Sequence, residues 1–244
     1  HGIGADSQSP DQSGIGMRRR RLASPSYRAA ILATPGLVGY WRLGELSGTV
    51  ARDELAKNHG TYVGSPTLGA AGLLAGDGDK AVTLNGSSQY VSIAAADALN
   101  LTAAFSVSTW IYWTSALKGG IVEKTIGGVV NTQWSLYIET GSFCAQVTLS
   151  GPTYVTVCTT ATGDLAHALT MTYDGATLRL FLNGVTVGTP AAASGVSGGS
   201  GVTLLGDLAV GGYKFGGRLD EINIWNRALT AAEIAALYRI GKGY

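Results

Sequence analysis

From Leu37 onward the sequence is a succession of short runs of β-branched, aromatic and aliphatic residues, most of them ended by a turn that contains glycine. Glycine accounts for 36 of the 244 residues, about twice its usual share. Runs of this length are typical of strands, and helical periodicity is nearly absent from them. The pattern predicts an all-β antiparallel sandwich with strands at residues 37–43, 81–84, 90–93, 105–113, 134–138, 143–149, 154–158, 168–173, 178–182, 202–205 and 219–225.

The run from Phe105 to Trp113 shows the clearest alternation. Phe105, Val107, Ile111 and Trp113 fall on one face of a strand, whereas Trp110 falls on the other. Because both faces carry aromatic side chains, we expect this strand to lie in the centre of its sheet.

Several turns are marked by residue pairs that tolerate positive φ angles. Asparagine or aspartate precedes glycine at 85–86, 174–175 and 183–184, each time between apolar runs. We therefore expect three hairpins at these positions.

One helix is expected near the C-terminus, at residues 230–238. Thr230 can cap it, and Glu233 stands three residues later in the position of a capping box. An apolar stripe follows, so the helix should pack on the edge of the sandwich. Residues 188–201 are rich in glycine, alanine and serine, and they indicate a mobile loop.

The charge balance excludes some partners. The chain carries 17 basic and 16 acidic residues, and only 14% of its residues are charged. Such a chain has no overall field that would attract nucleic acid or a membrane, and it offers few candidates for acid/base chemistry. No apolar run approaches the roughly 18 residues of a membrane helix, and the start of the chain lacks the basic-then-apolar order of a secretory signal.

The charge is unevenly distributed. Residues 1–28 contain the run Arg18, Arg19, Arg20 and Arg21 and have a net charge of +3, against −2 for the rest. They hold too few apolar groups to fold alone, so residues 1–30 are expected to form an extended basic arm. Such an arm can lie on nucleic acid, on an acidic protein surface or in solvent. We infer an assembly contact, with nucleic acid the less favoured partner.

Five segments carry a resemblance to a known family. They are GYWRLGE at 39–45, AVTLNGSSQYV at 81–91, FSVSTWI at 105–111, LFLNG at 180–184 and FGGRLDEINIWNRALT at 215–230. Their order resembles the laminin-G-like, concanavalin A-like jelly-roll family, in particular its bacterial and phage virion branch, over about residues 36–240. The resemblance implies a jelly-roll domain at residues 31–244. This fold serves lectins, adhesion domains, glycosidases and virion proteins, so function must come from sites.

A glycosidase is not expected. Hydrolases that resemble this chain in fold carry two glutamates and an aspartate at alternate positions of one strand, because two carboxylates must flank the glycosidic bond. Here Asp220 and Glu221 are adjacent, so in a regular strand they point to opposite faces. We therefore expect no catalytic residues.

The resemblance also implies a calcium site near the first strand. Asp53 is the natural ligand in the acidic loop 53–61, and Asp220 supplies a second carboxylate if the ends of the domain meet as in the family. The residues after Asp53 depart from the family pattern, and Lys57 adds an unfavourable charge. In the alternative interpretation Asp53 caps a turn and Asp220 bonds to a neighbouring loop.

Sugar binding requires exposed aromatic faces beside hydrogen-bonding groups. Trp113, Trp134, Tyr154 and Tyr213 are the candidates for stacking on a glycan. The other tryptophans considered, Trp41, Trp110 and Trp225, lie in strands that match the family core, and we expect them to be buried.

Cys144 and Cys158 flank a turn at residues 150–152. If the loop is centred on Gly151, the two side chains face each other, and a disulfide or a pair of free thiols is then equally compatible with the sequence. Two sulfurs without nearby histidines cannot build a metal site.

These observations favour a non-enzymatic virion structural protein, such as a phage capsid decoration or tail-associated protein. Its arm, with Arg18, Arg19, Arg20 and Arg21, is expected to bind other virion proteins in an oligomeric assembly, with the jelly-roll displayed outward to cell-surface glycans. The alternatives are an extracellular carbohydrate-binding or adhesion module and a filament subunit.

Overall fold

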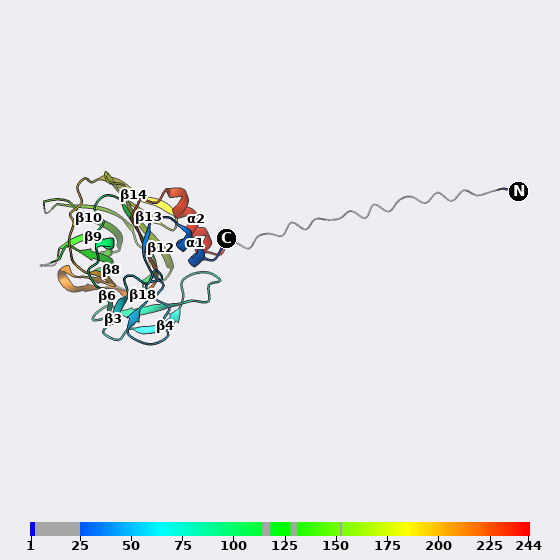
Figure 1. The fold of residues 1–244 in the computed structure, drawn as a ribbon, viewed down its shortest axis with the longest axis horizontal. Helices are drawn as coiled ribbons and strands as arrows, with labels where there is room; N and C mark the ends of the chain where they lie inside the picture. Colours follow the sequence, from blue (N-terminus) through cyan, green and yellow to red (C-terminus); the bar gives the residue numbers. More distant parts are fainter. Residues whose placement is uncertain (3–24, 114–117, 128–130, 152) are drawn as a thin grey trace.

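The computed structural model describes residues 1–2, 25–113, 118–127, 131–151 and 153–244. Within them, two mainly antiparallel sheets form a sandwich, as the sequence predicts (Figure 1). The first sheet orders β14 (Val185–Ala192), β13 (Thr177–Leu182), β12 (Ala166–Tyr173), β7 (Phe105–Trp113), β18 (Gly216–Trp225), β5 (Lys80–Asn85) and β4 (Thr67–Ala71), and β1 (Leu37–Trp41) also pairs with β18.

The second sheet contains the remaining strands. Its order is β11 (Tyr154–Thr160), β10 (Ser142–Thr148), β9 (Thr132–Glu139), β8 (Lys118–Thr125), β15 (Thr203–Leu205), β6 (Tyr90–Ile93), β3 (Gly60–Val63) and β2 (Val50–Ala51). The short strands β16 (Asp207–Leu208) and β17 (Tyr213–Lys214) pair with each other, and β17 also pairs with β8. The helices are α1 (Tyr27–Ala33) and α2 (Ala231–Gly241), and the 3-10 turns are η1 (Asp97–Leu99) and η2 (Val210–Gly212).

The central strand behaves as its alternation predicts. β7 lies between β12 and β18, and Phe105, Val107 and Ile111 are fully buried in the core between the sheets. Trp110 points to the opposite face, where the ring of Tyr238 stacks on it with 5.7 Å between ring centroids. The C-terminal helix therefore covers part of the outer face of the first sheet, and it also contacts β14, the edge strand of that sheet, so the expected packing on the edge is confirmed in part.

Both helices begin at capped residues. The Glu233 amide and the Thr230 hydroxyl of α2 form the expected capping box, in which the Glu233 carboxylate also accepts from the Thr230 amide at 2.8 Å. The helix α1 was not predicted. It starts after Ser26, whose hydroxyl accepts from the Ala29 amide, and Figure 1 shows α1 beside α2. None of the helices in the described ranges is long and apolar enough to span a bilayer.

The position of α1 changes the boundary of the expected arm. Tyr27 and Ile31 are one helical turn apart, both are buried, and Tyr27 packs edge-on against Trp110 with 6.3 Å between ring centroids. Residues 27–30 are thus part of a helix on the sandwich rather than of an extended arm. The run Arg18, Arg19, Arg20 and Arg21 lies outside the described residues.

Two other local expectations are corrected. The aspartate–glycine turn at 174–175 and the asparagine–glycine turn at 183–184 close hairpins. The turn at 85–86 does not, because Asn85 ends β5 in the first sheet and Tyr90 begins β6 in the second, so the chain crosses between the sheets there. The Asn85 carboxamide accepts from the amides of Ser87 and Ser88 and shapes that crossing. The first part of 188–201 is not a loop, because β14 continues to Ala192 through backbone pairing with β13.

The two cysteines are joined in a disulfide. Cys144 and Cys158 lie directly opposite each other on β10 and β11, as a loop centred on Gly151 requires. Closing a loop of 14 residues in the unfolded chain stabilises the folded state by roughly 3 kcal/mol.

Candidate functional site

A pocket of about 210 Å³ opens on the outer face of the second sheet. In β9, Trp134, Leu136 and Ile138 point into the core, so the alternating residues Ser135 and Tyr137 point away from it. We call this hollow the β8–β11 pocket. It is lined by Lys118, Thr132, Ser135, Tyr137, Glu139, Gln146, Tyr154, Leu208 and Tyr213.

Two tyrosines border the pocket with exposed rings. Tyr154, at the start of β11, is 53% exposed, and Tyr213, at the start of β17, is 41% exposed. These are two of the four side chains that the sequence singled out for stacking on a glycan. The fold brings them to one pocket from positions 59 residues apart in the chain.

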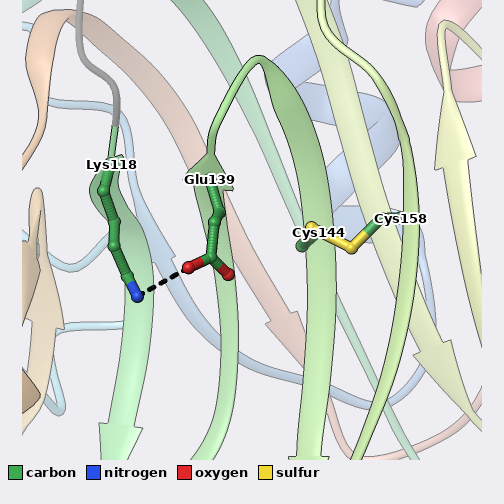
Figure 2. The surroundings of a disulfide bond; sticks show 4 residues. All are labelled: Lys118, Glu139, Cys144 and Cys158. Atoms are coloured by element: carbon green, nitrogen blue, oxygen red, sulfur yellow. Dashed lines mark hydrogen bonds and ion pairs between the residues drawn. A yellow bond between two sulfur atoms is a disulfide. The ribbon is translucent and has the colours of Figure 1, made fainter.

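An ion pair crosses the pocket. The Lys118 ammonium lies 2.8 Å from a carboxylate oxygen of Glu139, its partner across β8 and β9 (Figure 2). The same ammonium lies 4.7 Å from the centroid of the Tyr213 ring, within range of a cation–π contact. Hydrogen bonding to Glu139 raises the pKa of Lys118, so this lysine stays charged at neutral pH.

The disulfide adjoins the pocket floor. Cys144 packs in one cluster with Tyr137 and Leu208, both of which line the pocket, and Figure 2 shows the bridge to Cys158 beside the strand that carries Glu139. The covalent link between β10 and β11 thus holds together the strands that carry Gln146 and Tyr154.

The two tryptophan candidates do not reach this pocket. Trp134 is completely buried between the sheets, 5.7 Å from Phe105 between ring centroids, so it has no face to offer a ligand. Trp113 is half-buried and packs edge-on against Phe143 on the core side. Both were expected to be exposed, but each occupies a position in its strand from which the side chain points toward the core. The expected burial of Trp41, Trp110 and Trp225 is confirmed.

Asp53 does not have the surroundings of a calcium ligand. Its two carboxylate oxygens accept hydrogen bonds from the backbone amides of Tyr40, Leu55, Lys57 and Asn58, at 2.9 to 3.1 Å. These bonds occupy its lone pairs and cap the turn at residues 53–58.

Asp220 lies elsewhere, in β18, where one oxygen accepts from the Leu73 amide at 2.7 Å and the other has no partner. Across the residues that the structure describes, no three histidine, cysteine, aspartate or glutamate side chains gather as metal ligands. Because backbone amides already occupy the oxygens of Asp53, its contacts agree with the turn-capping interpretation; the calcium site at Asp53 and Asp220 stays a prediction.

Asp220 and Glu221 also depart from the expected opposite faces. The pairing of β18 with β7 is irregular between Asp220 and Asn223, and Glu221 has a left-handed φ of 54°. This bulge places both carboxyl groups near Tyr27. The pKa of Tyr27 is raised mainly by burial, and the negative charges of Glu221 and Asp220 raise it further. Both are buried, at 2% and 0% exposure, so no sugar reaches them.

The described lining of the pocket holds one carboxylate, Glu139, whereas glycosidases use a pair. Glu123 lies in the neighbouring strand β8, opposite Ser135. Glu123 is also buried, accepts from the Thr132 hydroxyl and the Ala209 amide, and has a pKa raised mainly by burial.

The sequence did not single out the polar residues of the pocket. Lys118 and Glu139 sit at the ends of β8 and β9, and β8 was not predicted at all, because its glycines and charged residues mask the strand pattern. The alternation of inward and outward side chains along β9 and β10 is the one sequence signal that would have predicted that the Gln146 side chain points away from the core.

Comparisons with known proteins agree with this architecture. A profile described as "Concanavalin A-like lectin/glucanases superfamily" matches residues 85–235. No curated protein matched the chain. Among solved structures, the receptor-binding domain of botulinum neurotoxin C/D mosaic serotype is similar, with a TM-score of 0.65 and 13% identity over 84% of this chain and 51% of that one.

Two further structures give the same result. The binding domain of Paraclostridial Mosquitocidal Protein 1 has a TM-score of 0.64 and 15% identity over 83% of this chain and 52% of that one. The binding domain of botulinum neurotoxin DC in complex with SialylT has a TM-score of 0.63 and 13% identity, with coverage of 84% and 51%. The chain thus spans about half the length of these proteins, and at such identity the likeness concerns the fold alone. The profile match includes β8 to β11 and more than half of the chain, and the protein belongs to the concanavalin A-like lectin/glucanases superfamily.

Proposed function

We propose that this protein is a non-enzymatic carbohydrate-binding module and that its ligand lies in the β8–β11 pocket. The observation that carries the proposal is the pair of exposed rings, Tyr154 and Tyr213, at the border of one polar pocket. Aromatic faces beside a few oriented polar groups are what a sugar ring requires, because its C–H faces are apolar and its edge bears hydroxyls.

The remaining lining suits the same ligand. Gln146 brings an amide group, and Ser135 and Tyr137 bring hydroxyls, each of which can pair with a sugar hydroxyl. The family profile supports this proposal, and so do the named ligands of two structurally similar chains. One is a complex with SialylT, and the other is botulinum neurotoxin type C, whose cell entry depends on interaction with two ganglioside molecules.

Truncating either exposed tyrosine tests the site. Tyr154→Ala and Tyr213→Ala are each expected to weaken glycan binding by about tenfold, which corresponds to about 1.4 kcal/mol of lost stacking. The measurement is titration calorimetry with the tightest binder from an array of neutral and acidic oligosaccharides. Tyr244→Ala is the matched control, because Tyr244 is 78% exposed and does not line this pocket. Equal affinities for all three variants would place the ligand elsewhere.

We further propose that the protein works outside the cytoplasm. The disulfide between Cys144 and Cys158 supports this, because such bonds persist in oxidising surroundings. A virion surface and an extracellular setting both meet that condition.

The virion role remains a prediction. In this role the N-terminal arm binds other virion proteins, and the jelly-roll is the domain displayed outward. Its support is the net charge of the N-terminal segment, which contains Arg18, Arg19, Arg20 and Arg21. Deleting residues 3–24 retains Ser26 and Tyr27, which begin α1, so the shortened chain is expected to fold and to bind glycan normally. It is also expected to be lost from purified particles, as measured by quantitative mass spectrometry. Full incorporation of the shortened chain would contradict an arm-anchored role.

A further inference from the structure

We infer that the β8–β11 pocket selects uncharged sugar chains over acidic ones, an inference that rests on the carbohydrate-binding function proposed above. The structurally similar chains do not lead to this conclusion, since one of them was solved with SialylT. The argument comes from how the charges of this pocket are paired.

The lining of the pocket is electrically neutral. Among its nine described residues, Lys118 is the one cation and Glu139 the one anion, and their charged atoms are 2.8 Å apart. A carboxylate on a sugar would have to compete with Glu139 for the ammonium while lying next to the negative charge of Glu139. The ammonium also faces the ring of Tyr213 at 4.7 Å, so it is held on two sides.

The surroundings of the pocket repeat this arrangement. Lys214, next to Tyr213 in β17, pairs with Asp207 at 2.7 Å and lies 4.9 Å from the centroid of the Tyr90 ring. Beneath Thr132 lies Glu123, whose carboxylate accepts the Thr132 hydroxyl. Lys118 is therefore the one lysine that an anion meets in the described lining of the pocket; the nearby Lys214, which does not line it, is paired in the same way, and the carboxyl group of Glu123 lies beneath the surface.

A neutral sugar finds suitable partners in the same place. The lining supplies an amide from Gln146, hydroxyls from Ser135 and Tyr137, and the rings of Tyr154 and Tyr213. Such groups bond to sugar hydroxyls without a charge to neutralise, and the paired ions Lys118 and Glu139 can each add a charge-assisted bond to a hydroxyl.

Matched glycans provide the test. Each neutral oligosaccharide on an array is paired with the same oligosaccharide extended by sialic acid, and affinities of the best pairs are then measured by calorimetry. The neutral member is expected to bind about tenfold more tightly than its acidic counterpart, because a sialic acid carboxylate next to Glu139 meets a like charge; a tenfold difference corresponds to about 1.4 kcal/mol.

One substitution should reverse the preference. Glu139→Gln releases the Lys118 ammonium and gives the lining a net positive charge, so binding of the sialylated member is expected to improve by about tenfold relative to the neutral one. Glu54→Gln is the matched control. It releases Arg28, a residue of α1, from a similar pair at 2.6 Å outside this pocket, and it should leave the preference unchanged.

The outcomes separate the two proposals. Equal or tighter binding of the acidic member by the natural chain would overturn the preference for neutral sugars while leaving glycan binding in place. No binding to any oligosaccharide would remove the proposed function itself. An unchanged preference in Glu139→Gln would show that the ion pair does not set the selectivity.

Discussion

Replacing Arg42 with alanine is expected to lower the free energy of unfolding by about 4 kcal/mol. The Arg42 guanidinium lies 2.7 Å from the Glu221 carboxylate, whose side chain is fully buried, and it also pairs with Asp77 and Asp79. Without Arg42, the Glu221 carboxylate keeps a hydrogen bond from the Tyr40 hydroxyl but loses its compensating charge. Leaving a buried carboxylate uncompensated is costly in any fold.

Chemical denaturation of three variants measures this effect. The double variant Arg42→Ala with Glu221→Gln should recover part of the loss, because it removes the stranded charge as well. Arg179→Ala is the matched control, since its pair with Asp174 is about one-third exposed on both sides and should be worth less than about 1 kcal/mol. Equal costs for Arg42→Ala and Arg179→Ala would contradict the role assigned to the buried pair.

The same buried carboxyls should make the domain more stable at pH 5 than at pH 8. Burial raises the pKa of Glu221 to about 7 against the lowering effect of Arg42, and burial together with the Glu221 charge raises the pKa of Asp220. Between about pH 4.5 and 7 the folded chain therefore binds more protons than the unfolded chain. Stability falls as the pH rises through this window, by about 3 kcal/mol from Glu221.

Urea unfolding at pH 5, 6, 7 and 8 measures the slope. Glu221→Gln should flatten it, whereas Glu139→Gln, a half-exposed carboxylate on the other sheet, should leave it unchanged. Below the window the trend reverses, because the Arg227 bond holds the pKa of Glu233 at about 2, and that stabilisation is lost as the carboxyl becomes protonated. Stability that rises steadily from pH 5 to 8 would contradict the assigned protonation of the acid pair.

Much of the fold was predictable because its signals are local. The alternation of Phe105, Val107 and Ile111 along β7 and the capping box of Thr230 and Glu233 each depend on residues a few positions apart. The helix α1 was missed because its stability comes from burying Tyr27 and Ile31 against the sheet and its neighbours, which the segment itself does not reveal.

The candidate site was less predictable. The sequence identified Tyr154 and Tyr213 because any aromatic side chain near a strand end is a candidate for stacking on a sugar. Trp134 met the same criterion, yet it is fully buried. If the alternation along a strand is shifted by one position, a side chain moves from solvent to the core. The sequence alone did not establish which residues of β9 face the core.

By itself the amino-acid sequence determined the all-β class, the hairpins at residues 174–175 and 183–184, and the family, because turn chemistry and strand period act over neighbouring residues. Only the tertiary structure decided which aromatic faces are exposed, that Lys118 meets Glu139 in one pocket, and that Asp220 and Glu221 lie together beneath α1. The physical reason is that burial, charge pairing and the bulge at Glu221 depend on strands that are distant in the chain and adjacent only in the folded sheets.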